Sequence, residues 1–113
     1  FVGDVVGVDV SVLLKQLDAG LMPVVSPLSS DAAGCVLNIN ADTVAARIGA
    51  ALGAEKLILC TGAPGILEDV SDPSSLVSYT DLEGLARLQS AGSLADGMLP
   101  KASAIDPRSC TAR

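Results

Sequence analysis

Three short segments of this sequence carry side chains that could bind a ligand or take part in chemistry. The first is Asn38-Ile39-Asn40-Ala41-Asp42, where a short apolar run gives way to a helical pattern. Two carboxamides beside the free N–H groups of a helix start can hold an anionic or amide-bearing ligand. A structural role suits the same residues, with Asn40 capping the helix and Asp42 complementing its dipole. The spacing alone favours that structural role.

The other two segments are weaker signals when each is taken by itself. The glycine-rich turn Thr61-Gly62-Ala63-Pro64-Gly65 would let the backbone approach a phosphate, but an ordinary connection between a strand and a helix has the same composition. Lys101 follows Gly97-Met98-Leu99-Pro100 and is a compact cation of the kind that binds phosphate. A lone lysine, however, is most often a solvated surface group. Neither segment identifies a function alone.

Alternating strand-like and helix-like patterns position these segments. Apolar, β-branched runs predict strands over residues 2–8, 22–27, 35–39 and 56–60. Helical spacing predicts one helix between Asp9 as N-cap and Gly20, and a second over residues 41–52 that ends at Gly53. A third helix opens with the capping box Thr80-Asp81-Leu82-Glu83. Residues 28–34 and 68–79 are expected to be polar loops.

This order of elements predicts an α/β fold. Strands that alternate with helices are joined by βαβ crossovers, which give a sheet rich in parallel strands with helices on both faces. Ligands bind such sheets at the carboxyl ends of the strands, and the segments around Asn40 and Gly62 each follow a predicted strand. The sequence contains no internal repeat and no low-complexity linker, so we expect one domain or part of one.

The composition excludes several classes of function. Of the 113 residues, 50% are hydrophobic and 18% are charged, which excludes intrinsic disorder. The absence of histidine excludes His-based triads and His metal sites. With 13 acidic against 7 basic residues and an aromatic share of 2%, nucleic acid and anionic membrane surfaces are disfavoured as partners. No apolar run reaches the roughly 18 residues of a membrane span.

The cysteines and the first residue bear on compartment and length. Cys35, Cys60 and Cys110 are odd in number and widely spaced, which favours reduced thiols and a cytoplasmic location over a disulfide framework. The sequence begins at Phe1, within a strand-like run, so we expect it to be a piece of a longer polypeptide.

Several blocks of sequence are more specific together than any of them is alone. In chain order they are FVGDVVGVD (residues 1–9), GLMPVVSP (20–27), LNINADTVA (37–45), LGAEKLIL (52–59), PGIL (64–67) and GMLPK (97–101). From residue 1 to about residue 104, the sequence resembles the central part of the acetylglutamate kinases, a branch of the amino-acid kinase superfamily.

The resemblance implies a fold and an activity. The fold is a three-layer αβα sandwich with a mostly parallel sheet, incomplete at both ends of this chain. Residues 1–104 would form a partial amino-acid kinase domain and residues 105–113 a divergent, disordered tail. The family transfers the γ-phosphoryl group of ATP to the side-chain carboxylate of N-acetyl-L-glutamate, a step of arginine biosynthesis. Full-length members are cytoplasmic homo-oligomers, with no nucleic-acid or membrane partner.

The resemblance also assigns roles to particular residues. Asn38 matches the substrate-binding asparagine, Asp42 the aspartate that holds two catalytic lysines, and Lys101 the second of those lysines. Lysine charges and a metal ion suit the transfer of a phosphoryl group between two anions, and the ionised acceptor needs no general base. The Mg²⁺ would be held mainly by the nucleotide and not by protein ligands. The segments that match the ATP contacts are Gly62, Ala63, Pro64, Gly65, Ile66 and Leu67, followed by Ser93, Leu94 and Ala95.

The match fails at three places. The first catalytic lysine, the phosphate-facing glycine loop and a substrate-binding arginine precede the point where this sequence begins, so we expect the isolated chain to be inactive. Gly62 stands where many members carry an acidic or amide residue. After Lys101 the sequence becomes proline-broken and basic. Two alternatives therefore stay open: a sister kinase acting on another carboxylate, carbamate or a nucleotide, and a non-catalytic binding module of the same fold.

Overall fold

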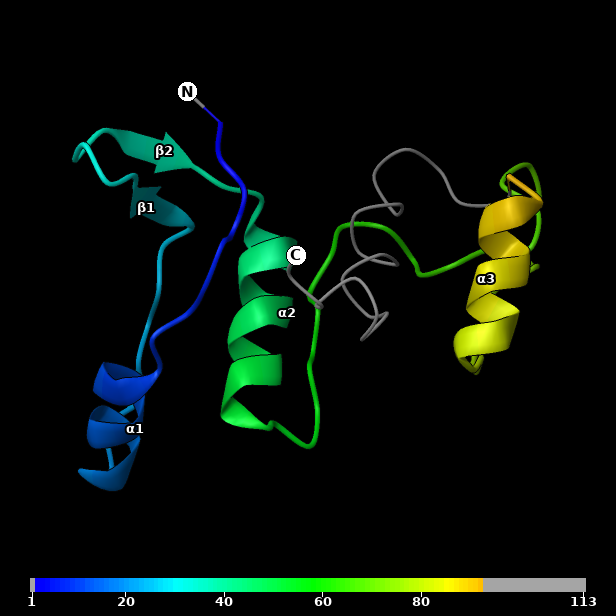
Figure 1. The fold of residues 1–113 in the computed structure, drawn as a ribbon. Helices are drawn as coiled ribbons and strands as arrows, with labels where there is room; N and C mark the ends of the chain where they lie inside the picture. The colour runs from blue at the N-terminus through cyan, green and yellow to red at the C-terminus, as the bar shows by residue number, and fades with distance from the viewer. Residues whose placement is uncertain (1, 93–113) are drawn as a thin grey trace.

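The computed structural model describes residues 2–92 of the chain. In chain order the elements are α1 (Ser11–Asp18), β1 (Leu28–Ser30), β2 (Val36–Asn38), α2 (Ala41–Leu52) and α3 (Leu82–Ser90) (Figure 1). Lys101, the Ser93-Leu94-Ala95 segment and the expected tail over residues 105–113 lie outside the described residues. Among residues 2–92, no helix is long and apolar enough to cross a membrane.

Helix α1 begins one residue later than a cap at Asp9 would place it. The Asp9 carboxylate still accepts a hydrogen bond from the Ser11 N–H at 2.9 Å, which satisfies a donor of the first turn. The end of the helix confirms the prediction for Gly20, whose φ is 74°. There the Gly20 N–H bonds to the Leu17 carbonyl and the Leu21 N–H to the Gln16 carbonyl, the paired bonds of a Schellman motif.

Helix α2 has the predicted bounds at both ends. Asn40 is its N-cap, and its side chain accepts hydrogen bonds from the backbone N–H groups of Asp42 and Thr43. Gly53 ends the helix in the left-handed conformation, with φ 64°. The Ala54 N–H then bonds to the Gly49 carbonyl at 2.9 Å, which satisfies one of the free carbonyls of the last turn.

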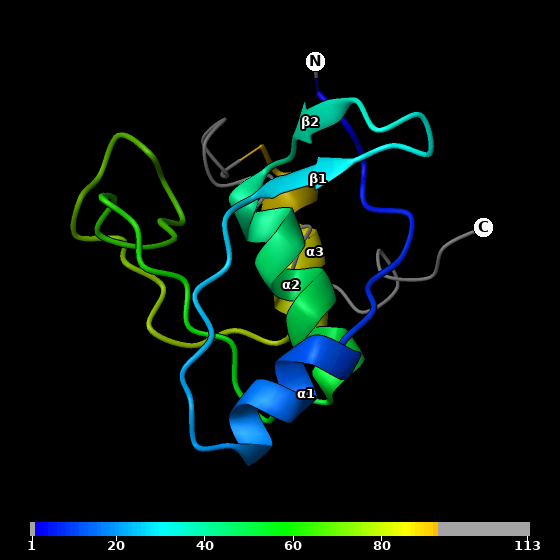
Figure 2. The ribbon, with the colours of Figure 1, turned by 90° about the vertical axis from the view of Figure 1, so that its left-hand side faces the viewer.

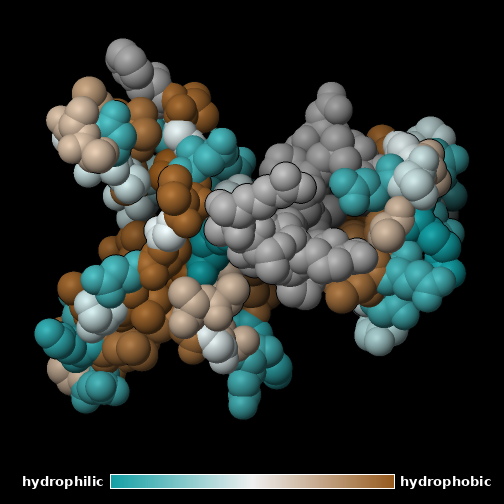
Figure 3. Space-filling view, viewed as in Figure 1, coloured by the Kyte–Doolittle hydropathy of each residue, from teal (hydrophilic) through white to brown (hydrophobic). Residues whose placement is uncertain are grey.

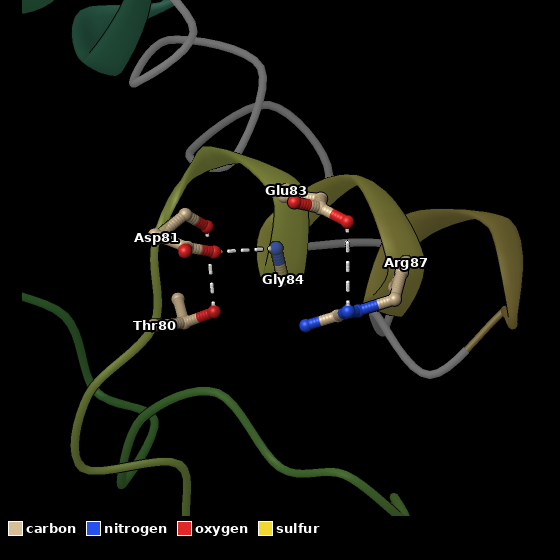
Figure 4. A network of polar contacts seen from close by, with 5 residues as sticks. All are labelled: Thr80, Asp81, Glu83, Gly84 and Arg87. Carbon is tan, nitrogen blue, oxygen red and sulfur yellow. Dashed lines mark hydrogen bonds and ion pairs between the residues drawn. The ribbon is translucent and has the colours of Figure 1, made fainter.

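Helix α3 forms where it was predicted, but the capping box is wrong. Asp81, and not Thr80, is the N-cap, and its carboxylate accepts from the Gly84 N–H at 2.7 Å (Figure 4). Glu83 therefore lies one position too early in the helix to return a bond to the cap. It pairs instead with Arg87 on the next turn, at 3.7 Å and exposed to solvent. An aspartate next to a threonine took the capping role because a carboxylate is a strong acceptor for helix N–H groups.

The sheet differs most from the prediction. Residues 28–34 were expected to be a loop, yet Leu28–Ser30 pairs antiparallel with Val36–Asn38 as a hairpin. The turn is organised by Asp31, whose carboxylate accepts from the N–H groups of Ala33 and Cys35, both at 2.9 Å. Side chains at a turn that bind their own backbone in this way fix a hairpin without an apolar run.

The predicted parallel strands over residues 22–27 and 56–60 are not formed in the described part of the chain. Only Val2 contributes a parallel bridge, to Asn38. A strand needs a ladder of backbone hydrogen bonds on at least one side. The Pro27 carbonyl does accept a hydrogen bond from the Ile39 N–H at 2.9 Å, but neither segment pairs with a neighbouring strand within residues 2–92, where Val24 is 92% and Ile58 82% exposed. The α/β character is present in residues 2–92 as a small two-stranded sheet with helices, which is consistent with part of an α/β fold.

Burial is concentrated around the strand–helix junction and in α3. Ile39, Ala46 and Leu85 are the buried hydrophobic residues of the described chain. Figures 1 and 2 show the hairpin at one end of α2 and α1 at its other end. In Figure 1, α3 stands on the opposite side of α2 from α1. Apolar side chains gather over α1 and the segment beside it (Figure 3), where Val12, Leu14 and Leu17 are exposed.

Candidate functional site

Asn38 lies at the carboxyl end of β2, opposite Leu28 in the hairpin. Its backbone carbonyl accepts a hydrogen bond from the Gly3 N–H at 3.1 Å. The next residue, Ile39, is 7% exposed and donates its N–H to the Pro27 carbonyl at 2.9 Å. Asn38 itself is exposed. The strand end is thus held on both sides, while the carboxamide predicted to bind substrate remains accessible.

Asn40 and Asp42 form the start of α2. The Asn40 Oδ1 accepts from the Asp42 N–H at 3.0 Å and from the Thr43 N–H at 3.1 Å. This bears out the structural interpretation of Asn40. Asp42 is half-buried in the first helical turn, where its charge complements the helix dipole. The structure therefore brings Asn38 and Asp42 to one strand–helix junction, on either side of the cap.

A cleft of about 450 Å³ opens between the N-terminal segment, α1, the residues before and within β1, and one face of α2. Its apolar wall includes Ile39, Val44 and Ile48. Asp9 also lines it, and the hydrogen bonds from the Ser11 N–H and hydroxyl hold the pKa of Asp9 below its usual value. Neither Asn38 nor Asp42 lines this cleft. The cleft could not be predicted from the sequence, because its lining comes from segments far apart in the chain.

The first segment predicted to contact the nucleotide, residues 62–67, has an exposed part and a half-buried part. Residues 61–64 form an exposed turn in which the Thr61 hydroxyl accepts from the Ala63 N–H at 3.3 Å. A Cβ added at Gly62 would meet no atom within 4 Å, so the backbone there is open to approach. At Gly65, φ is 144° and a Cβ would lie 2.7 Å from Leu76 Cδ1, which explains the glycine. The exposed turn can accommodate a phosphate-bearing ligand against its backbone.

Beyond Gly65 the chain doubles back on itself. The Val77 N–H bonds to the Ile66 carbonyl at 2.8 Å, and the Glu68 N–H to the Ser75 carbonyl at 2.9 Å. Leu67 and Leu76 form an antiparallel bridge between these bonds. Ile66 and Leu67 are therefore half-buried parts of a closed loop and not of an open turn.

The loop closed by this bridge contains two aspartate–serine turns. The Asp69 carboxylate accepts from the Ser71 N–H and hydroxyl, at 2.8 and 2.6 Å. Asp72 accepts in the same way from Ser74, at 2.8 and 2.7 Å. These bonds lower the pKa of both carboxyl groups, because they favour the charged form. The predicted acidic loop is thus a structured one, and the Asp-x-Ser spacing is the signal that could have revealed it.

A smaller cleft of about 330 Å³ lies against α3. Tyr79, Thr80 and Arg87 line it together with Glu68 and Leu88. These residues were not predicted to belong to a site, and no spacing in the sequence distinguishes them. Within residues 2–92, no group of three or more Asp, Glu or Cys side chains is placed to hold a metal ion.

Comparisons with known proteins identify relatives of this chain. The sequence model of the amino acid kinase family matches residues 1–106. The chain is 50% identical over 101 residues to the chloroplastic acetylglutamate kinase of Arabidopsis thaliana, covering 89% of this chain and 29% of that protein. It is also 50% identical over 104 residues to the acetylglutamate kinase of Myxococcus xanthus, covering 92% of this chain and 34% of that protein.

A solved structure is similar to this chain over most of the chain's length. The crystal structure of smu.665 from Streptococcus mutans UA159 superposes with a TM-score of 0.82 at 29% identity, over 92% of this chain and 41% of that one. This chain spans about a third of the length of the curated relatives that it matches. The family match runs through the whole described structure and on to Lys101. The chain belongs to the amino acid kinase family.

Proposed function

We propose that the protein containing this chain is an acetylglutamate kinase, which transfers the γ-phosphoryl group of ATP to the side-chain carboxylate of N-acetyl-L-glutamate in arginine biosynthesis. Membership of the family alone leaves the acceptor open. The observation that carries the choice is the identity of about 50%, over nine-tenths of this chain, to proteins bearing that name.

In this proposal the strand–helix junction binds the acceptor and organises the catalytic charge. Asn38, exposed at the end of β2, would donate and accept hydrogen bonds with the acceptor. Asp42, in the first turn of α2, would hold Lys101 by charge-assisted hydrogen bonds. Both reactants are anions, so a lysine held in advance near the transferred group lowers the cost of bringing them together and stabilises the developing charge.

The nucleotide would lie against residues 62–67 and 93–95. The open backbone at Gly62 supports this placement, since a phosphate can come close to it. The Mg²⁺ would reach the site on the phosphate oxygens of ATP, where it neutralises charge on the transferred group.

We also infer the wider setting of the chain. In the full-length protein the extended segments at residues 22–27 and 56–60 would join a mostly parallel sheet, which would complete a three-layer αβα sandwich. The exposed, free thiols of Cys35 and Cys60 suit the reducing cytoplasm. A homo-oligomer would fit the exposed apolar side chains over α1, which include Val12 and Leu17.

A coupled assay of the full-length protein tests the proposal. The expected result is turnover that needs ATP, Mg²⁺ and N-acetyl-L-glutamate together. Turnover with glutamate, aspartate or carbamate in place of the acetylated acceptor would indicate a sister kinase. No turnover with any of these acceptors, together with retained binding of nucleotide, would favour the non-catalytic module.

A further inference from the structure

Asn40 lies in the sequence between Asn38, which we propose binds the acceptor, and Asp42, which we propose holds the catalytic lysine. Its Oδ1 receives the backbone N–H groups of Asp42 at 3.0 Å and Thr43 at 3.1 Å. Its own carbonyl accepts from the Val44 N–H at 3.0 Å. With φ −60° and ψ 124° its backbone is extended, so the chain leaves the strand and enters the helix at this residue.

The strand side of Asn40 is fixed by other bonds. The Asn38 carbonyl is held by Gly3 and the Ile39 N–H by Pro27. Ile39 is also buried, at 7% exposure, so it anchors the strand end in the core. The first turn of α2 follows directly on this strand end, and the Asn40 carboxamide joins the two because it accepts from the Asp42 and Thr43 N–H groups. The orientation of this turn relative to Asn38 therefore depends on the cap that Asn40 provides.

We propose that Asn40 is a positioning residue for phosphoryl transfer, because its cap sets the place of Asp42 relative to Asn38. This inference rests on the proposed function. Through Asp42 the cap also sets the place of the catalytic lysine that Asp42 holds. The Asn40 carboxamide accepts hydrogen bonds from backbone N–H groups and does not contact the reacting atoms in this proposal, so Asn40 is not itself a catalytic residue.

The position of Asn40 predicts which kinetic constant depends on it. Loss of the cap frays the first helical turn and moves Asp42, whereas Asn38 stays held by the strand. A displaced lysine weakens stabilisation of the transition state, and displacements of about an ångström cost up to about 100-fold in rate. We therefore expect kcat to fall while KM for the acceptor changes little.

Three variants of the full-length protein test the inference. Asn40→Ala removes the capping oxygen, and Asn40→Ser restores one without adding charge. Asp81→Ala is the matched control, since it removes the cap of α3, where Asp81 accepts from Gly84 at 2.7 Å. The measurements are kcat and KM with N-acetyl-L-glutamate and ATP, together with the thermal midpoint and the hydrogen exchange of the Asp42 and Thr43 amides.

The expected result is a fall in kcat of about tenfold for Asn40→Ala, with KM within about threefold of wild type. The amides of Asp42 and Thr43 should also exchange faster in Asn40→Ala. Asn40→Ser should recover most of kcat and most of the protection of these amides. Asp81→Ala should lower the thermal midpoint and leave kcat unchanged. The inference is overturned if wild type turns over but Asn40→Ala and Asp81→Ala behave alike, or if Asn40→Ser fails to recover kcat. Absence of turnover in wild type would instead overturn the proposed function, and the inference with it.

Discussion

Asn40 and Asp42 belong to one short segment that caps a helix and to which we also assign a part in the proposed chemistry. Both asparagines are exposed, but the carboxamide oxygen of Asn40 accepts from the backbone of α2, which leaves Asn38 as the amide that we propose binds a ligand. The sequence indicated helix capping and ligand binding as possible roles of this segment. It could not assign each role to a residue, because capping and ligand binding use the same side chains. Lys101 could be found only by its place in a block, since a lysine has no local signature.

The role of Asp42 gives a prediction for the reaction. In the full-length protein, Asp42→Asn keeps the shape of the side chain and removes the charge that would hold the lysine. We expect kcat to fall by about 100-fold, comparable to the loss of one stabilising group, while the acceptor still binds. Steady-state kinetics check this, with Asp18→Asn in α1 as the control. A kcat equal to that of wild type would remove Asp42 from the mechanism.

Gly65 gives a prediction for stability. Its φ of 144° is a backbone conformation that residues with a side chain rarely adopt, and a Cβ there would also displace Leu76 Cδ1. Gly65→Ala should therefore lower the free energy of unfolding by about 1–3 kcal/mol. Gly62→Ala is the matched control in the same turn, because open space surrounds that position. Equal unfolding free energies for the two variants, measured in denaturant, would contradict the geometry described for this turn.

At the scale of elements, the helices and the strand over residues 35–39, which forms as β2 (Val36–Asn38), could be predicted, but the pairing of the sheet could not. The bounds of α2 follow from Asn40, its apolar stripe and Gly53, all of which are local signals. The hairpin was missed because Leu28-Ser29-Ser30 lacks an apolar pattern and depends on pairing with Val36–Asn38. The segments over residues 22–27 and 56–60 have strand patterns, but such a pattern does not determine which neighbouring strand, if any, a segment pairs with. Pairing is a property of the whole sheet, which is why sequence periodicity could not settle it.

Two glycines of α2 give a pair of opposite predictions. Gly49 lies inside the helix, and a Cβ added there would meet no atom within 4 Å, so Gly49→Ala should raise the free energy of unfolding by about 0.5–1 kcal/mol. Gly53 ends the helix with φ 64°, so Gly53→Ala should lower it by about 1 kcal/mol. Denaturant unfolding of the full-length variants measures both. Changes of the same sign would show that α2 does not end at Gly53.

The loop over residues 68–76 gives a prediction for pH. Hydrogen bonds from Ser71 and Ser74 lower the pKa of Asp69 and Asp72 in the folded state. A carboxyl group with a lowered pKa contributes stability above its unfolded value of about 3.9, and that stability is lost as the pH falls through the folded value. In an NMR titration, Ser74→Ala should raise the pKa of Asp72 and leave that of Asp69 in place. An unchanged Asp72 pKa would show that the bond from the Ser74 hydroxyl is absent in solution.

At the scale of the whole molecule, we propose that this chain supplies part of an active site. Asn38, Asp42 and Lys101 match one set of family roles, whereas the first lysine and the phosphate-facing glycine loop match nothing in the 113 residues. Because two positive charges are needed to bring a carboxylate and a triphosphate together, the isolated chain should show no turnover above background. A coupled assay of the isolated chain beside the full-length protein checks this. Comparable rates would mean that the mechanism does not require the missing groups.

Binding of N-acetyl-L-glutamate to the full-length protein tests the proposed function most directly. Titration calorimetry compares wild type with Asn38→Ala, and Gln89→Ala serves as the control because it removes an exposed carboxamide from α3. Loss of hydrogen bonds to a charged ligand should weaken binding of N-acetyl-L-glutamate by about 10- to 100-fold in Asn38→Ala and leave the affinity for ATP unchanged. An affinity for N-acetyl-L-glutamate equal to that of wild type would contradict the assignment of Asn38 to the acceptor site.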